Sequence, residues 1–282
     1  MTPAQTVHVG IQDGVSIPIT PEEFAWFTTF LRGRTGIELK DGKQALVMSR
    51  LDRRLRHHSA ASYKEYFALI SGGRGEEARI ALDLMTTNET YFFREPQHFE
   101  MLPRLLPSVA GQRPLRVWSA ASSSGEEAYS IALTLAEHDP SGLWEVFGSD
   151  LSHRIVDTAA RGLYPIEAAQ RVPGHLRTAY CLRGRGEHEG FFTFDAGLRS
   201  RVTFRQLNLT RPLPDLGTFD VVFLRNILIY FSSDTKRQVV DRVATTLRPG
   251  GYLLTSHAET LMGLETTLES FAPSVYRRRE QV

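Results

Sequence analysis

The stretch VWSAASSSGEEAYSIAL, residues 117–133, decides the fold. It begins with apolar residues, continues through a run of small residues that ends at Gly125, and then repeats apolar residues at helical spacing. A strand joined to a helix by such a loop can receive a nucleotide or a similar ligand on backbone N–H groups and on the helix N-terminus. Serines occupy positions 122–124, where dinucleotide-binding proteins have glycines, so an NAD enzyme is disfavoured.

Around this stretch, apolar strand patterns alternate with amphipathic helix patterns. After the helix EEAYSIALTLAEH come WEVFGSD, FDVVFLRN, TKRQVVDRVATTL, LRPGGYLLTSH and SVYRRR. This alternation predicts an α/β fold with a parallel, doubly wound sheet. Between Gly162 and Asn208 it is interrupted by short strand patterns joined by glycine turns, which predict a small antiparallel β subdomain inserted over residues 163–207.

The beginning of the chain has a different pattern. Thr20, Pro21 and Glu23 combine a cap, a first-turn proline and an early acid, which together predict a helix start. Gly36 is predicted to stop that helix, and KQALVMSRLDRRLRHH is predicted to form a second one. We therefore predict an N-terminal all-α domain with a linker over residues 1–78 and an α/β domain over residues 79–282.

The bulk composition excludes several classes of protein. With 41% hydrophobic and 23% charged residues, the chain is typical of a globular protein, and its net charge of +1 disfavours a nucleic-acid partner. Its apolar runs are too short to cross a bilayer, and its first residues lack a signal-peptide pattern, so no membrane insertion and a cytoplasmic location are expected. The single cysteine, Cys181, is predicted to be a packing residue, and no metal site is expected.

Three acids border the predicted loop. Glu126 and Glu127 open the helix, where the helix dipole favours them, but one of them can instead accept hydrogen bonds from a ribose or a cationic group. Asp150 ends the second strand, where a carboxylate can accept both hydroxyls of a ribose or cap the following helix. Its distance of about 25 residues from the loop favours the ribose.

Together with Asn208 and the turn of Pro249, Gly250 and Gly251, these features resemble those of the S-adenosylmethionine-dependent methyltransferase fold. Enzymes that methylate amide or amino nitrogens commonly carry a proline pair after the fourth strand, where this chain reads LRNILIYF. A carboxylate acceptor needs no such motif, because its pKa of about 4.3 leaves it ionised at neutral pH. No general base is then required.

Four segments, in order and spacing, carry a specific resemblance: TNETYFFRE, SAASSSGEEAYS, GSDLS and RNILIYF. They are similar to the signature segments of the CheR family, the chemotaxis receptor methyltransferases that esterify glutamates on receptor helices. The resemblance extends from about residue 20 to residue 278. It implies a Rossmann-like class I S-adenosylmethionine-dependent sheet, with the inserted antiparallel subdomain and the N-terminal all-α domain.

The resemblance also implies roles for individual residues. The cofactor, with S-adenosylhomocysteine as its product, would be contacted by Asn88, Thr90, Arg94, Glu127, Asp150, Asn208, Leu209, Asn226 and Ile227. Arg94 and Tyr230 would be catalytic, standing beside the transferred methyl group and orienting the reactants. Phe92 and Phe93 would hold their segment in the core. Ala128 departs from the family pattern, in which proline is common, and His257 is predicted to be structural.

Partners follow from two further features. A basic helical face is either solvated or binds acidic receptor helices, and its members are Arg50, Arg53, Arg54 and His57. The inserted subdomain offers a sheet edge to which a receptor C-terminal peptide can add as a strand. A monomer is expected. Two alternatives stay open, namely an RNA methyltransferase and a non-catalytic module that senses S-adenosylmethionine.

Overall fold

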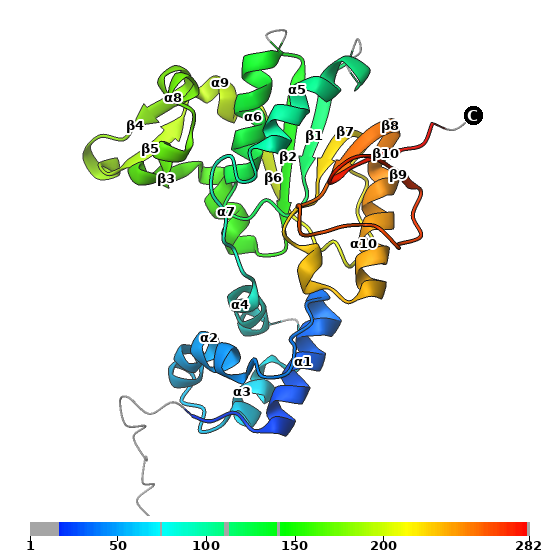
Figure 1. Cartoon of the computed structure of the whole chain (residues 1–282). Helices are drawn as coiled ribbons and strands as arrows, with labels where there is room; N and C mark the ends of the chain where they lie inside the picture. The colour runs from blue at the N-terminus through cyan, green and yellow to red at the C-terminus, as the bar shows by residue number, and fades with distance from the viewer. Residues whose placement is uncertain (1–16, 74, 110–112, 140–141, 281–282) are drawn as a thin grey trace, which may run out of the picture. The chain divides into compact units, whose positions relative to one another are not determined.

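A computed structural model describes residues 17–73, 75–109, 113–139 and 142–280, and the chain divides into two units between Thr87 and Asn88 (Figure 1). The boundary predicted after residue 78 is wrong, because it lies inside helix α4 (Glu76–Met85). This helix buries Ala78, Ala81 and Met85 and packs on the two helices before it. The glycine-rich segment before α4 is therefore a turn within the first unit, and each unit is described below by itself.

The first unit is all-α, as predicted. Its other helices are α1 (Pro21–Thr35), α2 (Gln44–His57) and α3 (Tyr63–Ile70). The side chain of Thr20 accepts a hydrogen bond from the Glu23 N–H, the Glu23 carboxylate accepts one from the Thr20 N–H, and Gly36 ends α1 with φ 75°. The predicted helix start and stop are thus confirmed. Aromatic rings fill the core between α1 and α3, where Phe27 stacks on Phe67 at 5.1 Å.

The second unit is built on a seven-stranded sheet with the order β6-β2-β1-β7-β8-β10-β9 (Figure 1). Its strands are β1 (Leu115–Ser119), β2 (Trp144–Asp150), β6 (Val202–Gln206), β7 (Phe219–Phe223), β8 (Leu247–Leu254), β9 (Leu268–Ala272) and β10 (Val275–Arg278). The strands from β6 to β8 are parallel, and β10 runs antiparallel between β8 and β9. This order and these directions confirm the predicted class I fold.

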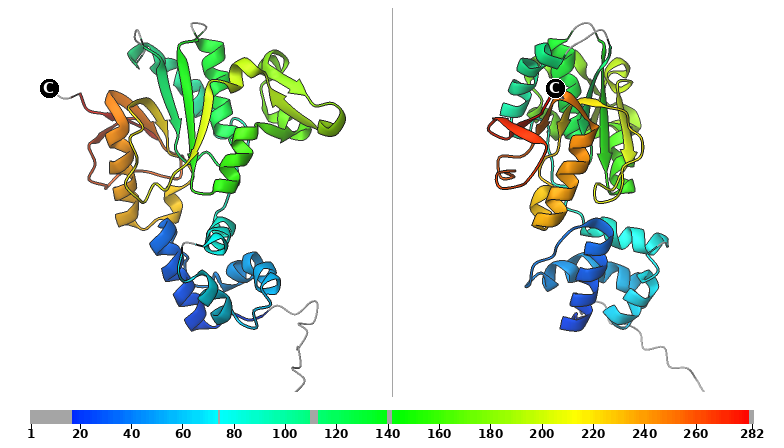
Figure 2. Two further views of the ribbon diagram at one scale, coloured as in Figure 1. Left: turned by 180° about the vertical axis from the view of Figure 1, so that it is seen from behind. Right: turned by 90° about the vertical axis from the view of Figure 1, so that its right-hand side faces the viewer.

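Helices cover both faces of this sheet (Figure 2). Successive strand residues point to opposite faces, so Val117 packs in the core beside α5 (Gln97–Val109) and α6 (Glu126–His138). Trp118 packs in the other core, beside α10 (Ser233–Thr246). The remaining helix over the parallel part, α7 (His153–Arg161), packs on β2 and β6. Both faces are buried, which explains the almost continuous apolar runs of the central strands.

The insertion forms a separate antiparallel sheet of order β3-β5-β4, as predicted. Its elements are β3 (Leu163–Pro165), η1 (Ile166–Arg171), α8 (Gly174–Tyr180), β4 (Cys181–Arg183), η2 (Gly186–His188), β5 (Phe191–Phe194) and α9 (Ala196–Arg199). The predicted end at residue 207 is wrong, because β6 pairs in parallel with β2 and so belongs to the main sheet. The pairing extends from Val202, opposite Val146, to Gln206, opposite Asp150, which explains this placement.

Among the described residues, no helix combines the length and the apolar character that crossing a bilayer requires.

Candidate functional site

The predicted loop lies at the carboxyl ends of the parallel strands, between β1 and α6. At this point β1 has β2 on one side and β7 on the other, the topological switch point where open α/β sheets bind ligands. Ser123 has φ 48°, and Gly125 has φ 97°, which favours glycine. A Cβ atom at Gly125 would also lie 2.8 Å from the hydroxyl oxygen of Tyr164, so a larger residue would displace the loop.

Asp150 lies beside this loop and shapes it. Its carboxylate accepts hydrogen bonds from the backbone N–H groups of Ser123, at 2.9 Å, and Ser152, at 3.1 Å. The cap of α7 is Ser152, whose hydroxyl accepts from the Ile155 N–H. Asp150 is therefore not the helix cap that the sequence left open, and its carboxylate stays at the strand ends where a ribose would bind.

The segment from Asn88 to Glu95 is fastened to the same region. The Ser123 hydroxyl donates to the Asn88 carbonyl at 3.1 Å, and the Phe93 N–H donates to the Ser130 hydroxyl at 3.0 Å. Phe92 is buried against Tyr164, Phe192 and Phe194, so the predicted role of this ring in the core is confirmed. Phe93 and Glu95 both have φ 56°, a conformation that costs non-glycine residues about 1 kcal/mol or more.

Arg94 is half-buried within this segment. Its guanidinium donates to the Glu89 carbonyl at 2.7 Å and lies 5.9 Å from the centre of the Tyr91 ring. The guanidinium of Arg171 lies 4.9 Å from the centre of the same ring. Within the described residues, Arg94 forms no ion pair with its neighbour Glu95. Glu95 instead lies against Arg225.

Arg225 is one of two residues near the strand ends whose role the sequence patterns did not predict. It is only 3% exposed and follows β7 closely. Its guanidinium donates to Glu127 at 3.0 Å and to the Arg94 carbonyl at 2.5 Å, and it lies 3.4 Å from the Glu95 carboxylate. One buried cation thus joins α6, the Asn88–Glu95 segment and the end of β7. A charged residue closing an apolar strand is the sequence signal that points to it.

The two acids at the start of α6 differ. Glu127 accepts from Arg225 and from the Ser119 hydroxyl, at 2.8 Å, so one of its partners is a cationic group of the chain itself. Burial raises the pKa of Glu127, and the charge of Arg225 opposes that rise. Glu126 accepts from the Ser124 hydroxyl at 2.6 Å, and burial raises its pKa as well.

A second missed residue, Glu259, shapes the segment after β7. It is 1% exposed, and its carboxylate accepts from the backbone N–H groups of Asn226, at 2.7 Å, and Ile229, at 3.2 Å. Asn226, with φ 59°, also donates through its side chain to Glu95 at 3.3 Å. Burial raises the pKa of Glu259, and the backbone amides oppose that rise. The carboxylate therefore holds the turn that presents Asn226 and Ile227.

The remaining predicted residues of the second unit lie at the same sheet edge or on the segments just described. Asn208 and Leu209 follow β6, and the Asn208 side chain accepts from the Thr210 N–H at 2.9 Å. Thr90 and Tyr230 are half-buried, and in the part of the chain that the structure describes neither side chain makes a hydrogen bond. Tyr230 belongs to the single turn η3 (Leu228–Tyr230), directly after Asn226 and Ile227.

The four predicted cations of the first unit differ in their contacts and in their exposure. Arg50 donates to the carbonyl groups of Leu84, Met85 and Thr86 at 2.8 to 3.3 Å and so caps the end of α4. Arg54 forms an ion pair with Glu77. Both are internal contacts of the first unit, which corrects the prediction of one uniform basic face. Arg53 and His57 are exposed.

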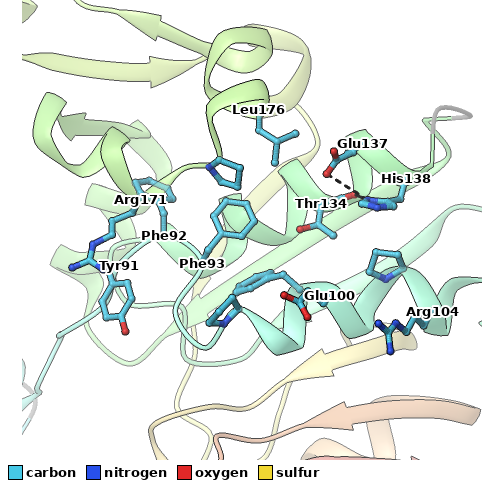
Figure 3. A pocket seen from close by; sticks show the side chains of 14 residues that line it. Tyr91, Phe92, Phe93, Glu100, Arg104, Thr134, Glu137, His138, Arg171 and Leu176 are labelled. Carbon is cyan, nitrogen blue, oxygen red and sulfur yellow. Dashed lines mark hydrogen bonds and ion pairs between the residues drawn. The ribbon is translucent and has the colours of Figure 1, made fainter.

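A hollow of about 780 Å³ is lined in part by Tyr91, Phe92 and Phe93 of the Asn88–Glu95 segment (Figure 3). Rings and prolines form most of its wall, with charged side chains among them, and its lining includes Tyr91, Phe93, Phe99, Arg104, Glu137 and Arg171. The residues predicted to contact the cofactor are not among those that line it. This hollow is therefore separate from the strand-end site.

Comparisons with known proteins agree with the two units. Residues 22–86 match a family model described as the CheR methyltransferase all-alpha domain, and residues 88–276 match the CheR methyltransferase SAM binding domain. Chemotaxis protein methyltransferase 2 of Pseudomonas aeruginosa is 38% identical over 263 residues, which cover 91% of this chain and 93% of that protein. A chemotaxis protein methyltransferase of Vibrio anguillarum is 39% identical, and the match covers 90% of this chain and 94% of that protein. One of Escherichia coli is 34% identical, and the match covers 92% of each chain.

The first prediction concerns Arg225. Arg225→Met keeps an apolar stem but leaves Glu127 and Glu95 buried without their cation, so the free energy of unfolding should fall by about 3–5 kcal/mol. Urea denaturation measures this change. Arg104→Met, at an exposed arginine of α5, is the control and should change stability by no more than about 0.5 kcal/mol. An Arg225→Met protein as stable as the control would contradict the role of Arg225.

The second prediction concerns pH and Glu77. Burial opposes ionisation of Glu77, but hydrogen bonds from Arg54, Tyr66 and His58 outweigh burial and lower its pKa from 4.5 to about 2. A carboxyl whose pKa is lower in the folded state stabilises the protein above the unfolded pKa and loses that effect as pH falls. The first unit should therefore lose stability between pH 4.5 and about pH 2. Glu77→Gln should flatten this dependence in denaturation curves, and an unchanged slope would refute the assignment.

Proposed function

The chain belongs to the CheR methyltransferase family, and from this premise we propose that it methylates glutamate side chains of chemoreceptors. The products would be glutamate methyl esters, formed during chemotactic adaptation. One observation carries the proposal. The Asn88–Glu95 segment is hydrogen-bonded to the loop after β1 and to Arg225 after β7. These hydrogen bonds hold Arg94 beside the strand ends, where Asp150 and Asn226 lie.

S-adenosylmethionine is the cofactor of the second unit. Two features of the strand-end site fit it. Asp150 places a carboxylate at the end of β2, and the buried Ser122 hydroxyl has no hydrogen-bond partner among the described residues. Asp150 would hold the ribose, and the other contacts would come from Asn88, Thr90, Arg94, Glu127, Asn208, Leu209, Asn226 and Ile227. When bound, the cofactor supplies a methyl group attached to a sulfonium sulfur, and S-adenosylhomocysteine is the leaving group.

The residues of the chain would then act mainly by orientation. A glutamate carboxylate is already ionised at neutral pH, so no group has to remove a proton from it. Arg94 would attract and align this carboxylate, and Tyr230 would pack beside the reacting atoms. Correct alignment is worth up to about 7–11 kcal/mol of the barrier. Closing the site to water would help further, because the reaction neutralises two opposite charges.

Receptor binding would use the exposed cations of α2. Arg53, Arg56 and His57 are exposed and lie three and four residues apart, so they share one side of the helix. Arg50 and Arg54 are left out of this proposed surface, because both are held by partners within the first unit. Acidic receptor helices would complement the exposed cations and raise the rate of encounter.

The inserted sheet offers a second contact for the receptor. Its outer strands are β3 and β4, and β4 exposes Leu182, while Phe191 is exposed on the neighbouring β5. A receptor C-terminal peptide would add to the edge at β4 by main-chain hydrogen bonds. Such tethering would raise the local concentration of the receptor without altering the chemistry.

The third prediction tests the reaction. Incubation with methyl-labelled cofactor and receptor-containing membranes should label the receptor, and base should release the label as volatile methanol, because it hydrolyses esters. Arg94→Ala should lower the rate on the order of 100-fold or more, the size of loss found when one preorganised donor is removed from an active site. Arg104→Ala is the control and should keep full activity. Base-stable label, or a fully active and folded Arg94→Ala enzyme, would overturn the proposal.

The fourth prediction tests the receptor surface. Reversing the charge of Arg53 and Arg56 to glutamate should raise KM for the receptor and leave the affinity for S-adenosylhomocysteine unchanged. Initial rates at varied receptor concentration and calorimetry measure the two quantities. Arg154→Glu, at an exposed position of α7, is the matched control. An unchanged KM in the double variant would exclude this face as the receptor contact.

A further inference from the structure

Three side chains of metal-binding types converge next to Arg225. Glu95 precedes α5, His98 lies in the first turn of α5, and His257 lies in the turn after β8. One ligand atom from each lies within 4.8 Å of the others. The Glu95 carboxylate oxygen and the Nδ1 atom of His98 are 3.4 Å apart, and the two imidazole rings have centroids 4.9 Å apart.

His98 is the observation that points to a ligand. Its ring is 2% exposed, and among the described residues neither of its nitrogens has a hydrogen-bond partner. Its contact with Glu95 lacks the geometry of a hydrogen bond. A buried polar atom without a partner costs about 1–3 kcal/mol, and native proteins rarely leave one. A ring with both nitrogens in this state, beside a carboxylate and a second imidazole, needs a further partner.

The surrounding charges allow that partner to be a cation. The guanidinium of Arg225 lies 3.4 Å from Glu95 and opposes a second positive charge. The carboxyl groups of Glu95, Glu127 and Glu259 offset this positive charge. Glu127 accepts a hydrogen bond from Arg225. Glu259 lies next to Glu95, because both accept hydrogen bonds from Asn226 and Ser256. The site therefore has more acidic than basic groups.

The donor set selects the kind of ion. Two imidazoles and one carboxylate suit Zn²⁺ and similar transition ions, whereas Mg²⁺ and Ca²⁺ prefer oxygen ligands alone. Ligands about 2.0–2.1 Å from a tetrahedral zinc ion lie roughly 3.3 Å apart, close to the separation of Glu95 and His98. The Nδ1 atom of His257 lies 3.2 Å from the Ser274 hydroxyl, which leaves Nε2 as its ligand atom and orients the ring.

We propose that Glu95, His98 and His257 bind one divalent transition ion of the Zn²⁺ type, which ties the start of α5 to the turn after β8. This inference departs from the sequence-based expectation that the chain has no metal site. The proposed ion would also give the exposed side chain of His257 a role as a ligand. It is also independent of the proposed glutamate substrate.

Zinc titration of the full chain tests the proposal. The protein should carry no histidine tag, because a tag binds zinc, and should first be treated with a chelator. Competition with a chromophoric zinc chelator should show one tight Zn²⁺ per chain and no comparable binding of Mg²⁺. His257→Ala, at an exposed residue, should weaken zinc binding by more than roughly 100-fold. Loss of a hydrogen bond to a ligand costs roughly 10- to 100-fold, and loss of the ligand itself should cost more. His153→Ala, at an exposed histidine that pairs with Asp157, is the control.

A second variant separates the site from a general effect on folding. Ser274→Ala keeps all three ligands and removes the hydrogen bond to His257, so it should weaken zinc binding by roughly tenfold. Thermal melting with and without Zn²⁺ should show stabilisation in the wild type and in His153→Ala, and little in His257→Ala. Either the lack of stoichiometric zinc binding in the wild type or wild-type affinity in His257→Ala would overturn the proposal.

Discussion

The ion pair of Arg225 with Glu127 is the interaction on which the second unit depends most. It lies at the carboxyl ends of the central strands, where the loop, the Asn88–Glu95 segment and the turn after β7 meet. A buried arginine is unfavourable unless its donors are used, and here they reach Glu127 and the Arg94 carbonyl, with Glu95 close by. The contacts of the two terminal nitrogens of Arg225 therefore place Arg94 at the sheet edge.

This arrangement links stability to function. Phe93, Glu95 and Asn226 all adopt left-handed backbone conformations that residues other than glycine rarely favour, and they flank the buried ion pair. Packing of Phe92 and hydrogen bonds to Glu95 and Glu259 offset that strain. A strained but firmly held segment is suited to a reaction in which the protein contributes orientation rather than proton transfer.

Local patterns predicted much of the fold and part of the geometry at the strand ends. The cap at Thr20, the loop before Gly125 and the position of Asp150 are encoded by neighbouring residues, and the structure has each of them. Arg225 was missed because its partners Glu127 and Arg94 are 98 and 131 residues away in the sequence. The misplaced end of the insertion has a related cause, since VTFRQ reads as a strand in either sheet and only its pairing with β2 decides.

The central claim is that the cofactor binds at the strand ends, between Asp150 and Arg94. A crystal structure of the chain with S-adenosylhomocysteine tests it most directly. The ribose hydroxyls should lie within hydrogen-bond distance of the Asp150 carboxylate, and the sulfur atom should face Arg94. A ligand seated instead in the hollow lined by Tyr91, Phe93 and Arg171, with Asp150 not engaged, would contradict it.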